Sequence, residues 1–321
     1  MNNPWCAIEK PDSDFNVRLV DDTHPLKLFW GVDVRSHYLF AYDAGIEGLP
    51  PKRALPSLSG VDVYCSLHGG RGKMVLVLQD NSNWEIFHAL CSDLIRATLE
   101  VRDEAAASNI ILRRLQRWQE LLRRTRPGIL TPDQIKGLMG ELLFLRGPLA
   151  SAFSTDTAVG AWRGPEGAPQ DFSFGEASVE VKCQSGGTKP VVRINSADQL
   201  SPQLPFGWLV VYTLARQDTK QPGSTTLNLL VTQIRSALSG SSEVGRERFE
   251  DLLYMAGYIT REEYDDYLFS VVSVKTYQLL PGFPRITGGD LIAGVESVNY
   301  AVRLDACAEF LARPPWWPTD L

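Results

Sequence analysis

The sequence lacks the features of a secreted, zinc-bound or membrane-spanning protein. Its five cysteines are odd in number and scattered, with no CxxC or Cys/His spacing, so neither a disulfide framework nor a structural zinc site is predicted. Nowhere do 18 apolar residues follow one another, and the first residues lack the basic and apolar regions of a signal peptide. No membrane span is therefore expected, and we expect the protein in the reducing cytoplasm.

Histidine is also scarce, and negative charges outnumber positive ones. The four histidines, His24, His37, His68 and His88, all lie in the N-terminal third, and no Gly-x-Ser-x-Gly nucleophile elbow occurs, so a Ser/His or Cys/His hydrolase is a weak hypothesis. The formal net charge is -6, which gives no overall attraction to nucleic acid. This weighs against a protein that coats DNA non-specifically, but it leaves room for an enzyme with a local basic groove.

The chain is long enough for more than one domain. Its 321 residues exceed the usual size of one compact domain, and 44% hydrophobic and 22% charged residues are ordinary for a globular protein. We expect a strand-rich and then helical domain at residues 1–127, a core domain at 128–236 and a C-terminal α/β extension at 237–321. Pro127-Gly128 marks the first boundary.

The N-terminal part changes from strands to helices. Apolar runs predict strands at 26–33, 38–42 and 74–78, and i, i+3, i+4 spacing predicts two helices within 84–124. The glycine-rich stretch Gly69–Lys73 lacks the spacing of a P-loop, so we interpret it as a hairpin loop.

The second of these helices ends in a basic run: Arg113, Arg114, Arg117, Arg123, Arg124 and Arg126. Such a run is either a solvated face that favours the helix C-terminus or a stripe that contacts phosphates. For the second alternative, Arg123 and Arg124 are our candidate DNA-binding residues.

The most informative stretch runs from Pro169 to Lys182. Polar and apolar residues alternate on either side of Gly175-Glu176, which suits a two-residue hairpin turn. That turn pairs Phe174 with Ala177 and so places Asp171 opposite Glu180. One face would then carry Phe172, Phe174, Val179, Val181 and Cys183, and the other Asp171, Ser173, Ser178, Glu180 and Lys182.

This second face suggests a reaction. Two opposed carboxylates repel unless a cation lies between them. Lys182 supplies one cation, and Mg²⁺, which is usually held by one or two carboxylates plus waters and phosphate oxygens, would supply another; Mn²⁺ is expected to substitute. Asp171, Glu180 and a lysine around a metal suit phosphodiester hydrolysis, with the lysine orienting the nucleophile or stabilising the developing charge. The alternative is an ordinary Glu-Val-Lys strand without a site.

A capped helix precedes the hairpin. Thr131-Pro132-Asp133-Gln134 predicts a helix start, and the helix should run to about Arg146. Glu141 falls in its buried arc, where a carboxylate needs a partner. The partner is either an arginine, or the Asp171 cluster, which Glu141 would join as an outer ligand of the metal or its water.

Residues after the hairpin supply further DNA-binding candidates. Gln184 continues the polar face and either contacts a phosphate or caps the strand, Lys189 lies in a loop beside the site, and Arg193 adds charge to the groove. A strand buried on both faces is predicted near 206–214. Helices are expected at 231–239 and 244–257, and strands at 268–279 and 295–304.

Together, Gly140-Glu141 on a capped helix, Pro-x-Asp and Glu-x-Lys resemble the PD-(D/E)XK nuclease superfamily. More narrowly, the chain resembles an uncharacterised bacterial family grouped with it, in segments that span most of the sequence: Asp22–Leu26, Phe29–Gly31, Gly137–Leu145, Ala161–Pro165 and Asp171–Phe174. The resemblance implies a restriction-endonuclease-like core of the α+β or α/β class, a mixed central sheet flanked by helices. It implies Asp171, Glu180, Lys182 and Glu141 as catalytic residues, and it adds the Val181 carbonyl to Asp171 and Glu180 as metal ligands.

The resemblance also implies a biological setting. Such proteins tend to occur in restriction or phage-defence gene clusters, which implies a DNA substrate and partners from the same operon, and a homodimer is compatible with the sequence. The main hypothesis is a metal-dependent DNA endonuclease; the alternative is a non-catalytic DNA-binding or scaffolding subunit. The sequence departs from the superfamily twice: it has Pro-Gln-Asp in place of Pro-Asp, and Ser196–Leu200 leaves room only for a short helix after the Glu-x-Lys strand.

Overall fold

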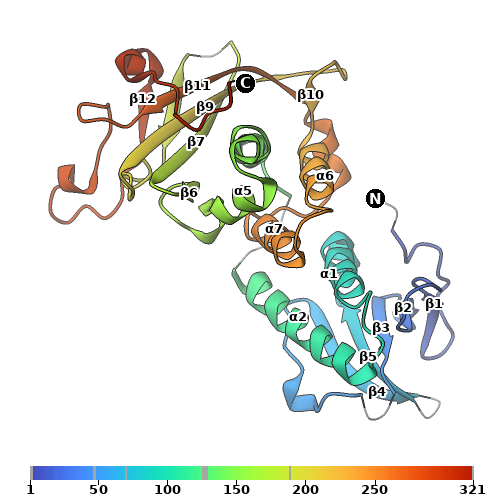
Figure 1. The fold of residues 1–321 in the computed structure, drawn as a ribbon. Helices are drawn as coiled ribbons and strands as arrows, with labels where there is room; N and C mark the ends of the chain where they lie inside the picture. Colours follow the sequence, from blue (N-terminus) through green and yellow to red (C-terminus); the bar gives the residue numbers. More distant parts are fainter. Residues whose placement is uncertain (1–2, 46–47, 69–70, 125–128, 188, 320–321) are drawn as a thin grey trace. The chain divides into compact units, whose positions relative to one another are not determined.

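The computed structural model of the chain describes residues 3–45, 48–68, 71–124, 129–187 and 189–319 (Figure 1). The chain forms two compact units, residues 1–128 and 129–321, and each is described by itself. The expected boundary dipeptide Pro127-Gly128 lies outside the described residues. No described helix is both long and apolar enough to cross a lipid bilayer.

The N-terminal unit is an antiparallel sheet with two long helices. Its strands lie in the order β1-β2-β3-β5-β4, and the helices follow the strands in sequence, as predicted. The elements are β1 (Phe15–Leu19), β2 (Leu28–Asp33), β3 (Tyr38–Asp43), β4 (Val61–His68), β5 (Arg71–Leu78), α1 (Trp84–Ala97) and α2 (Glu104–Arg124). The Trp118 indole N–H donates to Asp93 Oδ2 at 3.0 Å, which ties α2 to α1.

The loop expected at Gly69–Lys73 is wrong for its last three residues, because Arg71, Gly72 and Lys73 belong to strand β5. Strands β4 and β5 pair up to His68 and Arg71, and Gly69 and Gly70 lie outside the described residues. The Arg71 guanidinium contacts Asp43 Oδ1 at 2.7 Å and Glu104 Oε1 at 3.2 Å. Arg71 is thus held by two carboxylates of its own unit.

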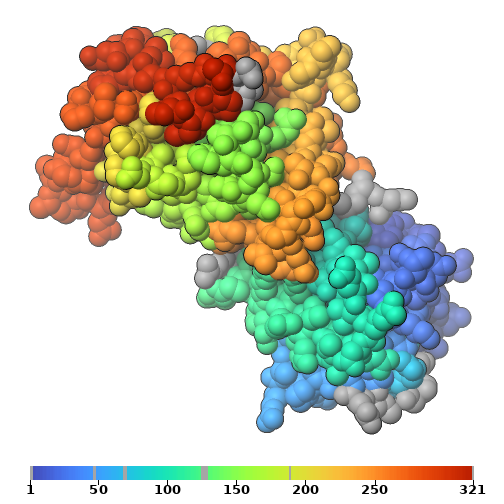
Figure 2. All heavy atoms as spheres, in the orientation of Figure 1, coloured from blue at the N-terminus to red at the C-terminus, as the bar shows by residue number. Residues whose placement is uncertain are grey.

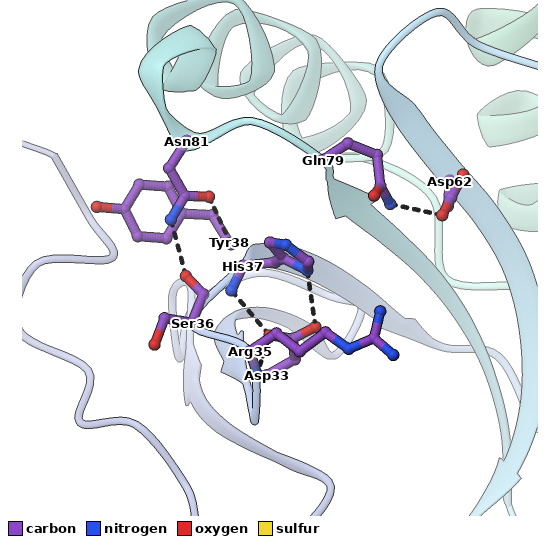
Figure 3. Close-up of polar contacts among 8 residues, drawn as sticks. All are labelled: Asp33, Arg35, Ser36, His37, Tyr38, Asp62, Gln79 and Asn81. Carbon is purple, nitrogen blue, oxygen red and sulfur yellow. Dashed lines mark hydrogen bonds and ion pairs between the residues drawn. The ribbon is translucent and has the colours of Figure 1, made fainter.

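The β2–β3 turn explains one of the four histidines (Figure 3). Asp33 Oδ1 accepts hydrogen bonds from the backbone N–H of Arg35 and of His37, each at 2.8 Å, and Asp33 Oδ2 lies 3.2 Å from His37 Nδ1. Asn81 donates to the Ser36 carbonyl at 2.7 Å, where Ser36 has a φ of +69°. His37 therefore helps to close a turn.

The second unit is built on a mixed sheet in the order β10-β11-β9-β7-β6. Strands β7 and β9 are parallel, whereas the other neighbours are antiparallel, and β8 and β12 form a separate two-stranded ribbon. The strands are β6 (Phe172–Phe174), β7 (Ala177–Ser185), β8 (Val191–Ile194), β9 (Phe206–Arg216), β10 (Ser224–Thr225), β11 (Phe269–Gln278) and β12 (Tyr300–Arg303). The chain therefore has a mixed α+β fold.

Two apolar clusters cover the two faces of this sheet. Val181 and Val210 pack into the larger cluster with α3, α6 and α7, and Leu209 and Val211 pack into a smaller one with the β8–β12 ribbon. Figure 1 shows α6 and α7 on one side of the sheet and β12 on the other. The helices are α3 (Pro132–Phe144), α4 (Ala150–Ala152), α5 (Thr155–Ala161), α6 (Leu227–Ala237) and α7 (Glu243–Met255). The prediction that β9 is buried on both faces is confirmed.

Several elements differ from their predicted extents, among them the helix expected at 231–239, which is α6 and begins at Leu227. The helical path does not stop near Arg146 but continues through a π-helical turn, Leu145–Leu149; this wider turn contains Pro148, which has no N–H to donate. The strand expected at 295–304 is shorter and consists of β12, Tyr300–Arg303. Residues 195–201 form bends and turns, so no helix lies between β7 and β9 in the described part of that connection.

The C-terminal segment packs on its own unit. The Trp316 ring lies 5.0 Å from that of Phe174 and 5.8 Å from that of Phe144, measured between centroids. Figure 2 shows this red segment lying on the surface against green residues of the same unit. It thereby covers the larger apolar cluster beside the hairpin.

Candidate active site

The hairpin has the predicted register. Phe172 pairs with Val179 and Phe174 with Ala177, and Gly175 has a φ of +52°, which favours glycine at this position. The same count places Asp171, just before β6, beside Glu180. Asp171 Oδ2 accepts the backbone N–H of Val181 at 2.8 Å, so this carboxylate is fixed against β7.

Strand β7 is more buried than its alternating sequence predicts. Val179 and Val181 enter the larger apolar cluster as expected, but Glu180, on the opposite face, is only 1% exposed. Residues of the β8–β12 ribbon and the turn at 195–201 pack on that face, because Leu200 joins the smaller cluster. Glu180 is consequently a buried carboxylate.

Lys182 is the cation beside Glu180. Its Nζ lies 2.7 Å from Glu180 Oε1, and its side chain is only 16% exposed. Among the described residues, Glu180 Oε2 has no hydrogen-bond partner, so the Lys182 ammonium is the main polar contact of this carboxylate. Lys182 Nζ donates a hydrogen bond to Gln199 Oε1 at 3.2 Å.

Helix α3 brings Glu141 to the same place. Its capping box is formed, since Gln134 N donates to Thr131 Oγ1 and Thr131 N to Gln134 Oε1. The helix can approach β7 closely at Gly140, where a Cβ would lie 2.3 Å from Cys183 Sγ. Glu141 follows directly, and its carboxylate lies near Asp171, just before the start of β6.

The partner of Glu141 is an indole and not an arginine. Trp162 Nε1 donates to Glu141 Oε2 at 2.7 Å. A Cβ on Gly164 would lie 2.8 Å from Asp171 Oδ1 and 3.2 Å from Glu141 Oε2. Both carboxylate oxygens thus border one small space beside Gly164, which agrees with the alternative that Glu141 joins the Asp171 cluster.

Burial and mutual repulsion oppose ionisation of the three acids. Burial raises the pKa of Glu141 well above its usual value, and the Asp171 charge adds to this rise although the Trp162 hydrogen bond lowers it. Burial and the Asp171 charge likewise raise the pKa of Glu180, and burial raises that of Asp171. Burial lowers the Lys182 pKa, but Glu180 and Asp171 outweigh it, so the Lys182 pKa is raised. A bound cation would stabilise the ionised forms of these three acids, because Lys182 alone supplies only one positive charge.

The donor set fits a hard divalent cation. Its ligands would be carboxylate oxygens, and among the described residues the buried Glu180 Oε2 has no hydrogen-bond partner. Within the described ranges, no three His, Cys, Asp or Glu side chains already converge as a complete ligand set. Such an arrangement suits an ion such as Mg²⁺, which is held by one or two carboxylates and otherwise by waters and phosphate oxygens.

The candidate DNA-binding residues are placed differently from one another. Lys189 and Arg193 are exposed, Arg193 on β8. Gln184 Nε2 donates to Thr213 Oγ1 at 2.9 Å, so this amide joins β7 to β9. Arg123 is exposed on α2 of the N-terminal unit and pairs with Glu120 at 2.9 Å; Arg124 follows it, and its side chain lies outside the described part.

Four residues of the site were not assigned a role from the sequence. Trp162 and Gly164 lie in the segment Ala161–Pro165 that carries the family resemblance, but nothing in that segment predicts their contacts. Gln170 was treated as a neutral insertion before Asp171. Gln199 gave no signal, because a glutamine in a polar turn has many ordinary explanations.

One comparison with known proteins identifies a family. A family profile matches residues 1–305, which include all the residues of the site described above. No curated protein and no solved structure matches the chain. The match confirms the resemblance drawn from the sequence, and the chain belongs to the family described as "Putative PD-(D/E)XK family member, (DUF4420)".

Proposed function

We propose that this protein is a divalent-metal-dependent DNA endonuclease with a restriction-endonuclease-like core. The observation that carries the proposal is that Asp171, Glu180 and Lys182 lie together in one buried place, where Glu141 joins them from α3. Membership of a PD-(D/E)XK family supports the same chemistry.

Each residue has a distinct task in this proposal. Asp171 and Glu180, with the Val181 carbonyl, would hold Mg²⁺ or Mn²⁺. When bound, such an ion would polarise the phosphate and lower the pKa of its water. The Val181 N–H keeps the Asp171 carboxylate oriented. Glu141, fixed by the Trp162 indole, would accept a hydrogen bond from a water bound at the site.

Lys182 acts on the phosphate or on the attacking water. Its raised pKa keeps the ammonium protonated at neutral pH, so it donates hydrogen bonds and cannot serve as a general base there. In a buried site a fixed positive charge stabilises developing negative charge more strongly than in water.

The test is cleavage of supercoiled plasmid and of single-stranded DNA with Mg²⁺, Mn²⁺ or EDTA. We expect metal-dependent cleavage that falls by about 100- to 1,000-fold in Asp171→Asn and in Lys182→Met, as for the loss of one preorganised transition-state contact. Lys275→Met, which removes an exposed lysine of β11, is the matched control. Cleavage by Lys182→Met at the wild-type rate would contradict the proposal.

We further propose that the enzyme acts in the bacterial cytoplasm with other proteins of a restriction or anti-phage defence operon. The cleavage assay is therefore repeated with the products of neighbouring genes. A wild-type protein that binds DNA and Mg²⁺ yet cuts nothing in either assay would instead support a non-catalytic DNA-binding or scaffolding subunit.

A further inference from the structure

Lys182 has a second anchor besides Glu180. Gln199 Oε1 accepts its Nζ at 3.2 Å and also accepts the backbone N–H of Asn195 at 2.7 Å. Since both partners are donors, the amide oxygen and not the nitrogen must face them. The Gln199 side chain is thus fixed in one orientation by its own turn.

The turn that carries Gln199 is itself held against the site. Gln170, the residue before Asp171, is 3% exposed, and its Nε2 donates to the carbonyls of Asp198 at 2.6 Å and Ser201 at 3.1 Å. Arg285 donates to the Leu200 carbonyl at 2.8 Å, and Leu200 is fully buried. The segment that positions Asp171 therefore also positions Gln199.

The Gln199 contact matters because Glu180, the other partner of the Lys182 ammonium, is also a proposed metal ligand. If Glu180 ligates a cation, its charge is shared with that ion, and its hold on the Lys182 ammonium weakens. Gln199 is neutral, so it keeps its hydrogen bond without competing with the carboxylates for the metal. An ammonium on a flexible four-carbon stem needs such a contact to stay in one place.

We propose that Gln199 is a positioning residue that holds the Lys182 ammonium when Glu180 is engaged by a divalent cation, and that Gln170 holds the turn that carries Gln199. The inference rests on the proposed function for its catalytic meaning. The contact between Gln199 and Lys182 is tested by a measurement that does not require DNA cleavage.

The first experiment measures the order of the Lys182 side chain by NMR relaxation, on full-length protein labelled with ¹³C at lysine Cε. Glu180→Met removes the ionic partner without adding an acceptor oxygen. We expect Lys182 to stay ordered in Glu180→Met and to become mobile in Glu180→Met/Gln199→Leu, with the order parameter of its Cε falling to that of an exposed lysine. Lys275, an exposed lysine, is the internal reference.

Added Mg²⁺ should weaken the Glu180–Lys182 ion pair and so affect the order of Lys182 as Glu180→Met does. Gln199→Leu alone is expected to leave Lys182 ordered without metal and mobile with it. Gln203→Leu is the matched control, because Gln203 lies on the same segment but is exposed and donates to Ser201. Equal order of Lys182 in Glu180→Met and in the double variant would overturn the proposal.

The second experiment is DNA cleavage. Gln199→Leu should lower kcat by about 10- to 100-fold, as expected for a misplaced catalytic group, with KM for DNA changed less than about twofold. An unchanged kcat in a variant whose Lys182 is mobile would overturn the catalytic part. If wild-type protein cleaves nothing, the proposed function fails. The metal-free NMR comparison of Glu180→Met with the double variant still shows whether Gln199 holds the Lys182 ammonium.

Discussion

At the scale of single residues, Lys182 is important for stability as well as for chemistry. The sequence places it on a polar face, which predicts that its removal costs little stability. The structure differs, because Lys182 is mostly buried and pairs with Glu180, which is 1% exposed. Removing one member of a buried pair leaves an uncompensated charge, whereas removing both does not.

We therefore predict that Lys182→Met lowers the free energy of unfolding by about 3 kcal/mol at pH 8 without metal. The double variant Lys182→Met/Glu180→Met should recover most of this loss. Chemical denaturation measures both, with Lys275→Met as a surface control expected within about 0.5 kcal/mol of wild type. A double variant no more stable than Lys182→Met would show that the pair is not the cause.

Glu180 gives a pH dependence of a definite sign. Its folded pKa lies well above the usual 4.5, so the folded state binds its proton more tightly than the unfolded state. This contribution lowers stability as pH rises from about the unfolded value towards the folded one. Glu180→Gln removes this contribution, so without metal the stability of the variant minus that of wild type should rise as pH increases from 5 to 8.

Thermal unfolding from pH 5 to pH 8, with EDTA or with Mg²⁺, checks this prediction. In wild type, Mg²⁺ at about 100 times its dissociation constant should add about 2.7 kcal/mol, and Glu180→Gln should lose this gain. Other carboxylates change the stability with the opposite pH dependence: Glu166, whose pKa is lowered, stabilises the folded state less as the pH falls. The quantity to compare is therefore the difference in stability between variant and wild type at each pH, because contributions such as that of Glu166 cancel in it. A difference that does not change with pH would refute the assignment.

At the scale of elements, the approach of α3 to β7 depends on one glycine. A Cβ on Gly140 would lie 2.3 Å from Cys183 Sγ, whereas one on Gly137 of the same helix would meet nothing within 4 Å. Glycine inside a helix costs about 0.5–1 kcal/mol relative to alanine. The two positions should therefore respond to the same substitution with opposite signs.

We predict that Gly137→Ala stabilises the protein by about 0.5–1 kcal/mol and that Gly140→Ala destabilises it by about 1–3 kcal/mol, as expected for overpacking. Since Gly140→Ala pushes Glu141 away from Asp171, it should also slow cleavage, and Cys183→Ala should restore both properties. Denaturation and cleavage assays measure this. A neutral Gly140→Ala would mean that α3 and β7 are not held at this distance.

The elements also show how far local sequence determines this site. The period-2 alternation and Gly175 predicted the β6–β7 register, and the capping box predicted the start of α3, because these signals depend on neighbours within a few residues. The contacts of Trp162 with Glu141 and of Gln199 with Lys182 join residues 21 and 17 positions apart. No local pattern encodes them. Glu180 is likewise buried under the ribbon of β8 and β12, and β12 is more than 100 residues distant in the sequence.

At the scale of the whole molecule, the candidate site belongs to one unit. Asp171, Glu180, Lys182 and Glu141 all lie within residues 129–321, and this unit has its own apolar core. Its first residues are part of that core: Leu130 is 8% exposed, and its N–H donates to the Tyr264 hydroxyl at 3.1 Å. The unit should therefore fold from about residue 129 onwards.

We predict that a fragment of residues 129–321 unfolds cooperatively and gains stability with Mg²⁺ as the full chain does, and that Glu180→Gln abolishes this gain in both. A fragment that begins at Asp133 should be less stable, because it loses buried Leu130 and the Thr131 cap, worth together about 2–4 kcal/mol. Thermal unfolding with EDTA and with Mg²⁺ measures all of these. A fragment 129–321 that folds but ignores Mg²⁺, while the full chain responds, would place part of the metal site in the N-terminal unit.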